Sequence, residues 1–190
     1  MVSRAGTDER RTDTREQIRD VALELFAEQG YERTSLREIA ERLGVTKAAV
    51  YYHYRTKEEI LESLFSDLFH GIDEIVGWGS AQPPGPETRR GVLERYSALL
   101  SGPGSRFDRT VRFLQEGQNS IKELPVGAEM KARFHALSEL LADPEASVAE
   151  QLRRRLALMA LHLGAFATDQ LGGDADERRE AALEVARELV

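Results

Sequence analysis

The sequence predicts an all-α fold of about nine helices, and three observations support it. Apolar residues recur at intervals of three and four along most of the 190 residues, as an amphipathic helix requires. No segment alternates apolar and polar residues with the period of two that marks a strand. All six prolines lie between Pro83 and Pro144, so proline cannot interrupt a helix before that stretch.

The first four helices are delimited by residues that cap helix ends. A side chain able to accept a hydrogen bond from the first turn precedes each helix, and in three cases Glu or Gln follows at the capping-box spacing. The pairs are Thr14 with Gln17, Ser35 with Glu38, and Thr56 with Glu59, while Thr46 stands alone. Gly30 and Gly44 suit the ends of the first two helices. The fourth helix carries a long apolar stripe from Ile60 to Val76.

A loop rich in proline and glycine, residues 78–86, follows the fourth helix. Downstream the apolar spacing stays helical, with stripes within residues 92–100, 107–114, 130–141, 148–171 and 182–189. These segments complete the predicted all-α chain.

Composition narrows the class of protein. The chain has no cysteine, which excludes disulfides, thiolate metal sites and thiol nucleophiles and makes the cytoplasm the expected location. The longest nearly apolar run, Leu156 to Ala167, is far shorter than the roughly 20 residues that span a bilayer. Residues 1–13 lack the apolar core of a secretory signal. We therefore expect no membrane partner.

The charge is unevenly distributed. The net charge of -7 by itself argues against nucleic-acid binding, because the phosphates of DNA attract clustered positive charge and repel negative charge. Residues 42–57, however, contain four basic side chains and no acidic one. The acidity lies mainly in residues 58–190, so the overall charge does not exclude a small basic DNA-binding face.

That basic stretch overlaps a predicted helix-turn-helix, residues 34–57. A small Ala40 suits the helix crossing, Gly44 allows a tight turn, and Val45 and Val50 are predicted to fill the joint. Basic and aromatic side chains around the third helix suit contacts with phosphates and base edges. The competing interpretation is a helical hairpin with a solvated basic face.

The wider pattern resembles the DNA-binding domain of the TetR/AcrR family of bacterial transcriptional repressors. The matching residues are Ile18, Ala22, Phe26 and Gly30-Tyr31; Thr34 to Ala40; Gly44 to Lys47; Val50 to Tyr54; and Lys57 to Leu61. The resemblance covers about the first third of the chain by motif. It implies an N-terminal helix-turn-helix and a C-terminal helical domain for effector binding and dimerisation.

The resemblance also implies roles for particular residues. The implied DNA-binding residues are Ser35, Arg37, Thr46, Lys47, Ala48, Ala49, Tyr51, His53 and Lys57. Lys47 and the two alanines would face bases, whereas Lys57 would contact a phosphate. Many relatives carry glycine and a hydroxyl residue where this chain has Ala48 and Ala49, which leaves methyl contacts there and shifts readout toward Lys47 and Arg37. Tyr52 and Tyr54 are expected to lie largely in the core.

Three domains are predicted. Residues 1–13, with several arginines, form a flexible N-terminal arm; residues 14–57 form the DNA-binding domain; residues 58–190 bind the effector and dimerise. The arm is either a minor-groove contact or a solvated tail.

The predicted helix that contains the long apolar run carries small residues, and the last predicted helix is amphipathic. Together these two helices suit a two-fold four-helix dimer interface. The predicted interface residues are Ala157, Ala160, Gly164, Thr168, Ala182, Val185, Ala186 and Leu189. The alternative is a central core helix of a monomer.

An effector pocket is expected among the C-terminal helices, lined by apolar residues with a few polar anchors. The candidates are Trp78, Phe107, Phe113, Gln115, Met130, Phe134, Met159, His162 and Phe166. Ordinary core packing is the alternative for each of them. The effector itself has no signature in the sequence.

The predicted function is therefore that of a homodimeric repressor, released from a palindromic double-stranded DNA operator by a small-molecule effector. The four histidines form no metal-ligand motif, and no phosphate-binding loop is present, so we expect neither an enzyme nor a cofactor or metal. A helical interaction module without DNA affinity, or less favourably a helical enzyme, remains as an alternative.

Overall fold

The computed structural model describes the backbone of residues 5–100, 124–166 and 171–190, and the side chains of residues 14–100, 124–165 and 171–190. The described residues form eight helices and no strand, which confirms the all-α prediction. The helix predicted around Phe107, Val111 and Leu114 lies outside the described residues.

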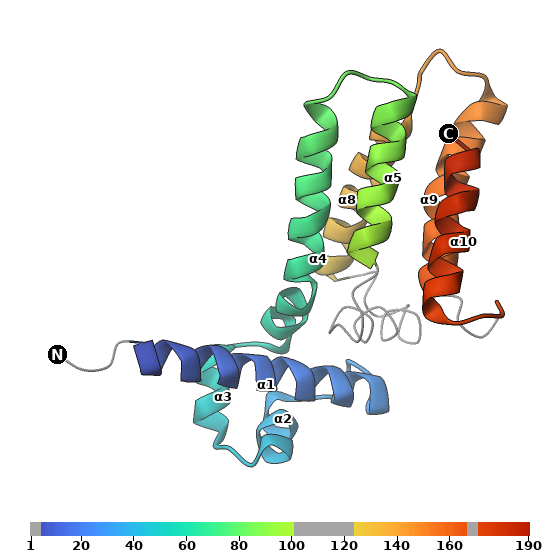
Figure 1. Cartoon of the computed structure of the whole chain (residues 1–190). Coiled ribbons are helices and arrows are strands. Elements are labelled where there is room, and N and C mark those ends of the chain that lie inside the picture. Colours follow the sequence, from blue (N-terminus) through green and yellow to red (C-terminus); the bar gives the residue numbers. More distant parts are fainter. Residues whose placement is uncertain (1–4, 101–123, 167–170) are drawn as a thin grey trace. The chain divides into compact units, whose positions relative to one another are not determined.

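The helices of the N-terminal part are α1 (Ala5–Gln29), α2 (Leu36–Leu43) and α3 (Lys47–His53), and the long α4 (Lys57–Ser80) follows. Further along the chain lie α5 (Pro86–Leu100), α8 (Pro125–Leu141), α9 (Val148–Phe166) and α10 (Ala175–Glu188). Figure 1 labels all eight.

The first helix begins earlier than predicted. The backbone is helical from Ala5, so the predicted start at Thr14 is wrong. The flexible arm predicted over residues 1–13 stays a prediction. Once a helix is nucleated around buried Ile18 and Ala22, each further turn adds backbone hydrogen bonds at little cost. No proline in residues 5–13 stops this extension.

The chain divides into two compact units. Among the described residues, the first comprises residues 5–66 and 124–127, and the second residues 67–100, 128–166 and 171–190. The predicted division after residue 57 falls inside the first unit, because Ile60, Leu61 and Leu64 at the start of α4 are buried in its core.

In the first unit, α2 and α3 lie on the same side of α1 (Figure 1). Its core is built from side chains that are at most 7 % exposed: Ile18, Ala22, Leu25, Phe26, Tyr31, Leu36, Ile39, Val50, Tyr54, Ile60 and Phe65. Burial of this apolar surface stabilises the unit. It also leaves the opposite faces of the short α2 and α3 in solvent.

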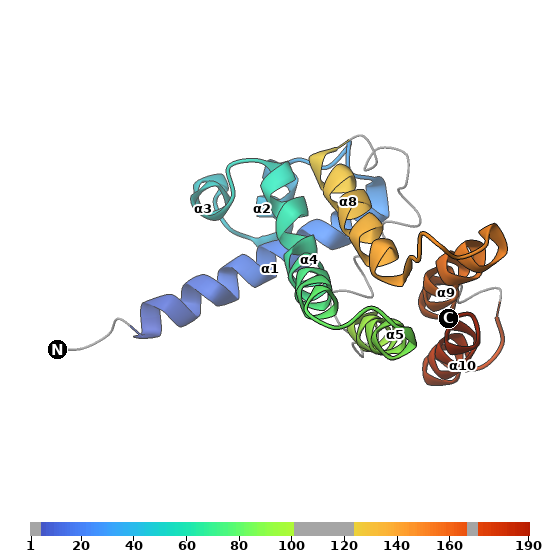
Figure 2. The ribbon, with the colours of Figure 1, turned by 90° about the horizontal axis from the view of Figure 1, so that it is seen from above.

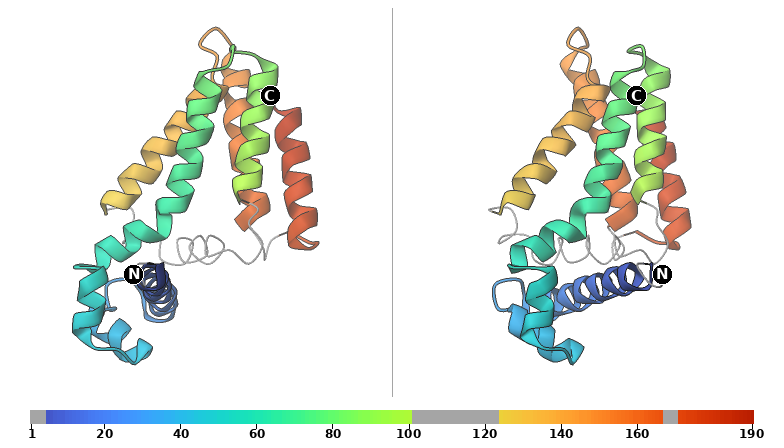
Figure 3. Two further views of the ribbon diagram at one scale, coloured as in Figure 1. Left: turned by 60° about the vertical axis from the view of Figure 1, so that its left-hand side comes forward. Right: turned by 90° about the vertical axis from the view of Figure 1, so that its left-hand side faces the viewer.

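In the second unit, α9 and α10 run side by side, as seen from the front and from above (Figures 1 and 2). Helix α5 packs against both, and Figure 3 shows this group from two further directions. Its core side chains include Leu93, Tyr96, Leu137, Leu141, Ala157, Leu158, Leu161 and Ala186.

Candidate nucleic-acid interface

Local hydrogen bonds fix both ends of α2. The Ser35 hydroxyl accepts a bond from the Glu38 N–H at 3.3 Å, and the Glu38 carboxylate accepts one from the Ser35 N–H at 2.9 Å. The Ser35 hydroxyl also donates to the Glu38 carboxylate at 2.8 Å, and this bond, followed by the bond from the Ser35 N–H, holds the pKa of Glu38 below its usual value. Gly44 ends the helix in the left-handed region at φ 69°, a conformation that favours glycine. The predicted capping box and turn glycine are confirmed.

Helix α3 begins directly after this turn. The Thr46 hydroxyl accepts a hydrogen bond from the Ala49 N–H at 3.2 Å, which confirms the predicted cap. Val50 is fully buried, whereas Thr46, Lys47 and Ala48 are exposed. One face of α3 therefore anchors the helix in the core and its first turn is open to a partner.

Two predictions for this helix pair are wrong. Val45 is 39 % exposed and does not fill the joint, because it lies in the turn between α2 and α3, where Gly44 and Thr46 are exposed as well. Tyr52 is 68 % exposed rather than buried. It shares the exposed side with Tyr51 and lies edge-on to the His53 ring at 5.2 Å between ring centroids. Sequence reasoning missed Tyr52 as a surface residue because it grouped Tyr52 with the buried Tyr54.

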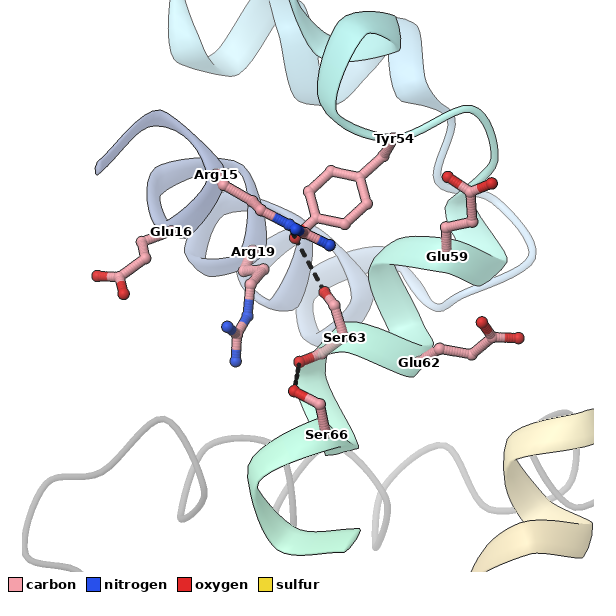
Figure 4. A pocket seen from close by; sticks show the side chains of 8 residues that line it. All are labelled: Arg15, Glu16, Arg19, Tyr54, Glu59, Glu62, Ser63 and Ser66. Carbon is pink, nitrogen blue, oxygen red and sulfur yellow. Dashed lines mark hydrogen bonds between the residues drawn. The ribbon is translucent and has the colours of Figure 1, made fainter. Parts of the chain in front are cut away.

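Tyr54 ties the end of α3 to two other helices (Figure 4). Its hydroxyl accepts a hydrogen bond from Nε of Arg15 at 3.1 Å and lies 3.0 Å from Oγ of Ser63. Since Ser63 Oγ donates to the Ile60 carbonyl at 2.7 Å, the Tyr54 hydroxyl donates to Ser63. The side chain is 1 % exposed, so this chain of hydrogen bonds satisfies a buried hydroxyl.

The same residues line an open groove of about 510 Å³ within the first unit. Its α1 wall carries two arginines and one glutamate, and its α4 wall carries two glutamates (Figure 4). The lining residues are Arg15, Glu16, Arg19, Tyr54, Glu59, Glu62, Ser63 and Ser66.

Lys57 is held by the chain itself. Its Nζ donates to the carbonyls of Tyr31 at 3.0 Å and Glu32 at 3.3 Å and lies 4.2 Å from the centre of the Tyr31 ring. Only 20 % of the side chain is exposed. Lys57 therefore fastens the turn after α1 to the start of α4, an intrachain role that the resemblance did not indicate.

The remaining cations of the helix-turn-helix differ in their partners. Nε of Arg37 lies 2.7 Å from Glu41, and Arg42 makes two hydrogen bonds to Glu28 at 2.8 and 3.3 Å. The hydrogen bonds from Arg42 hold the pKa of the Glu28 carboxyl below its usual range. Lys47 faces the Tyr51 ring at 5.2 Å.

The residues predicted to line an effector pocket are not brought together as a set. Trp78 packs against Gly91 and lies beneath the guanidinium of Arg95, 3.5 Å from its ring centre, at a groove of about 570 Å³ beside the proline-rich loop. Met159 is 48 % exposed on α9, and its assignment to a pocket stays a prediction. Phe107, Phe113, Gln115 and the side chain of Phe166 lie outside the described residues.

Two of the predicted pocket residues do meet. The rings of Phe134 and His162 lie 5.1 Å apart, and Met130 is half-buried on the same helix as Phe134. His162 Nδ1 lies 2.8 Å from the Leu158 carbonyl, and Nε2 lies 2.8 Å from the Tyr96 hydroxyl. Since a carbonyl only accepts, Nδ1 carries the proton and Nε2 accepts from Tyr96. Burial lowers the pKa of His162, consistent with this neutral ring.

Most of the predicted dimer residues are buried within the chain. Ala157, Ala182 and Ala186 are at most 8 % exposed, and a Cβ at Gly164 would overlap Ala182. The prediction is wrong for these four, because the small residues bring α9 close to α10 of the same chain. Val185 is 48 % exposed, Ala160 and Leu189 are half-buried, and Thr168 lies outside the described residues.

A different face of α9 is exposed and apolar. It is formed by residues spaced three or four apart, each 46 to 82 % exposed: Val148, Leu152, Leu156, Met159 and Leu163. We call this set the α9 stripe.

No helix among the described residues is long and apolar enough to cross a membrane. No group of three or more histidine or carboxylate side chains among them is placed to hold a metal ion.

The capped helix pair, its buried joint and the exposed start of α3 define a helix-turn-helix protein. Residues 18–64 match the family model described as bacterial regulatory proteins, tetR family. The N-terminal part of the chain therefore carries a helix-turn-helix domain of the TetR/AcrR type.

Individual relatives agree with this assignment. The HTH-type transcriptional regulator AcrR of Shigella flexneri is 41 % identical over 71 residues, which cover 37 % of this chain and 31 % of the relative. The HTH-type transcriptional repressor KstR2 of Rhodococcus jostii is 37 % identical over 140 residues, covering 72 % and 60 %. The chain thus spans less than two thirds of these relatives.

Solved structures share the fold over nearly the whole chain. The structure of SmeT in complex with triclosan is 25 % identical, with a TM-score of 0.63, and the match covers 92 % of this chain and 90 % of that one. The regulator FadR from Bacillus halodurans is 19 % identical with a TM-score of 0.62, covering 91 % and 94 %, which shows the fold alone.

Proposed function

We propose that the chain is a sequence-specific DNA-binding transcriptional regulator, and specifically a repressor that a small-molecule effector releases from a palindromic operator. The observation that carries this proposal is the exposed first turn of α3, opposite the buried Val50. A helix held in this way fits the major groove, where Lys47 bonds guanine edges and the methyl groups of Ala48 and Ala49 meet thymine methyls. The site of action is then the cytoplasm.

Residues around α3 supply the backbone contacts in this proposal. Ser35 and Arg37 lie at the start of α2, and Tyr51 and His53 lie at the end of α3. The exposed Tyr52 joins them, since a phenolic hydroxyl donates readily to phosphate oxygen. Repression is supported by the family relationship to a protein named as a transcriptional repressor.

The α9 stripe supports a homodimer. Five large apolar side chains on one exposed helix face form the kind of patch that marks a protein interface. A second copy that buries both stripes about a two-fold axis would give two recognition helices for the two halves of a palindrome.

Sedimentation velocity at micromolar concentration tests the dimer. We expect the wild type to be dimeric and Leu156→Glu to be monomeric, because the carboxylate would be buried at the centre of the paired stripes. Leu171→Glu is the matched control, since Leu171 has the same 46 % exposure and lies outside the stripe. A monomeric wild type, or equal effects of both substitutions, would overturn this interface.

We propose that the effector binds in the second unit, beside Phe134 and His162. These side chains, with the half-buried Met130, offer apolar surface. His162 would serve as a polar anchor by exchanging its bond with Tyr96 for one with the effector. The complex of the structural relative SmeT with triclosan supports a small molecule as the effector. Release follows if the effector prefers the conformation that does not bind DNA.

Selection of genomic fragments by the purified chain tests DNA binding directly. We expect enrichment of a palindromic sequence that binds at physiological salt. A chain with no sequence preference would refute the proposal and favour the helical interaction module.

Lys47→Ala tests the base-reading role. We expect weaker operator binding and a relaxed preference at the base that Lys47 contacts, with a loss of about 1–3 kcal/mol there. An unchanged sequence preference would remove Lys47 from direct readout. Arg55→Ala serves as the control, because Arg55 lies after α3 and should affect all sequences alike.

A further inference from the structure

The cations around the helix-turn-helix fall into two groups. Arg37, Arg42 and Lys57 each have a carboxylate nearby, from Glu41 at 2.7 Å, Glu28 at 2.8 Å and Glu32 at 3.8 Å respectively. No carboxylate among the described residues forms an ion pair with Lys47, which faces only the Tyr51 ring. The cation assigned to base reading is therefore among those that form no ion pair in the described part of the chain.

Of these three pairs, that of Arg37 and Glu41 is the most exposed to solvent. Both residues lie on α2, one turn apart, with 75 % of the Arg37 side chain and 61 % of the Glu41 side chain exposed. The Glu41 carboxylate occupies Nε of Arg37, which is a donor that a DNA phosphate would use. Solvent screens such an exposed pair, so a phosphate can replace the carboxylate at little cost.

Replacement does not remove the charge of Glu41. After Arg37 turns to a phosphate, the carboxylate stays within one helical turn of the DNA backbone and repels it. The effective positive charge that the protein brings to DNA is smaller by about one for each bound protomer. Because phosphates are the same in every sequence, the effect does not depend on the bases.

We propose that Glu41 acts as a phosphate substitute on Arg37 and thereby sets the strength and salt dependence of binding to all duplex DNA. This inference rests on the proposed DNA-binding function. It assigns Glu41 a role in affinity that is separate from the sequence readout by Lys47.

The test is Glu41→Gln, which keeps the size and exposure of the side chain. Binding of the full chain to the selected operator and to a scrambled duplex of equal length is titrated between 50 and 200 mM salt. Glu139→Gln is the control, because it removes the same charge from an exposed site on α8 in the second unit. Unchanged thermal unfolding of both variants verifies the fold.

We expect Glu41→Gln to tighten binding to both duplexes by the same factor, roughly fivefold per protomer at 0.15 M salt, and to steepen the slope of log K against log salt by about 0.9 per protomer. The control should match the wild type. The proposal is refuted if the two variants behave alike, or if the gain is confined to one duplex. If the wild type binds neither duplex at 50 mM salt, the proposed function itself fails, whereas binding that Glu41→Gln leaves unchanged overturns only the role of Glu41.

Discussion

Gly164→Ala probes how closely α9 and α10 approach within one chain. A Cβ at this position would overlap the Cβ of Ala182 and lie 2.8 Å from the carbonyl oxygen of Arg178. Both atoms belong to the framework of α10, so no flexible side-chain end can move aside. Accommodation requires a shift of the whole helix.

The magnitude follows from two opposing terms. Overpacking of this kind costs about 1–3 kcal/mol, while alanine is favoured over glycine inside a helix by about 1 kcal/mol. We expect a net loss of about 1 kcal/mol in the free energy of unfolding. Gly77→Ala is the control, because a Cβ at this exposed position in α4 meets nothing within 4 Å. It should instead gain about 0.5–1 kcal/mol.

Urea denaturation at one fixed protein concentration measures both variants, and sedimentation measures their self-association. Ala182→Gly in the Gly164→Ala background should recover part of the loss, since it removes one of the two close contacts. If Gly164→Ala were as stabilising as the control, the close approach of α9 and α10 would be refuted. If it left unfolding unchanged and weakened the dimer, Gly164 would belong to a subunit interface after all.

Three further predictions concern stability. Ser35→Ala removes the cap of α2 and should cost about 1 kcal/mol by urea denaturation; no loss would show that the capping box does not hold α2. Burial lowers the pKa of His162 in the folded chain. As the pH decreases below about 6.5, the unfolded chain therefore binds a proton at His162 more readily than the folded chain, and the free energy of unfolding should decrease. His162→Gln should flatten this dependence between pH 7.5 and 5.5, and an unchanged slope would assign it to other groups. Lys57→Ala should lose about 1 kcal/mol of stability, from its bonds to two carbonyls, and weaken binding to every duplex; normal stability would contradict the fastening role.

The helix-turn-helix could be predicted from interactions between residues that are close in the sequence. The caps at Ser35 and Thr46 and the turn at Gly44 depend on residues within a few positions of one another, so the sequence contains the whole interaction. The box predicted at Thr56 is only partly formed: Thr56 accepts from the Glu59 N–H, but the Glu59 carboxylate accepts from the Arg55 N–H instead. Backbone geometry at the turn decides which donor is closer.

Predictions that depend on distant partners were less successful. Small residues at 157 and 164 correctly indicate a close helix contact, yet the pattern does not say whether the other helix belongs to the same chain. The acceptors of Lys57 are backbone carbonyls at residues 31 and 32, which have no side-chain signature. Tyr52 and Tyr54 are the same residue type, yet Tyr52 lies within α3 with its side chain 68 % exposed, whereas Tyr54 follows the last residue of α3 and is buried.

The caps described for the helix starts have a consequence for the kinetics of folding. Ser35, Thr46 and Thr56 form such caps, and so does Asp174, whose carboxylate accepts from the first backbone N–H groups of α10. Each cap limits fraying through a partner two or three residues away, without any contact to a distant segment. Helix initiation is the costly step, and contacts between sequence neighbours close quickly. We therefore expect these helices to take up their boundaries early in refolding, so that the slower search concerns only how completed helices dock.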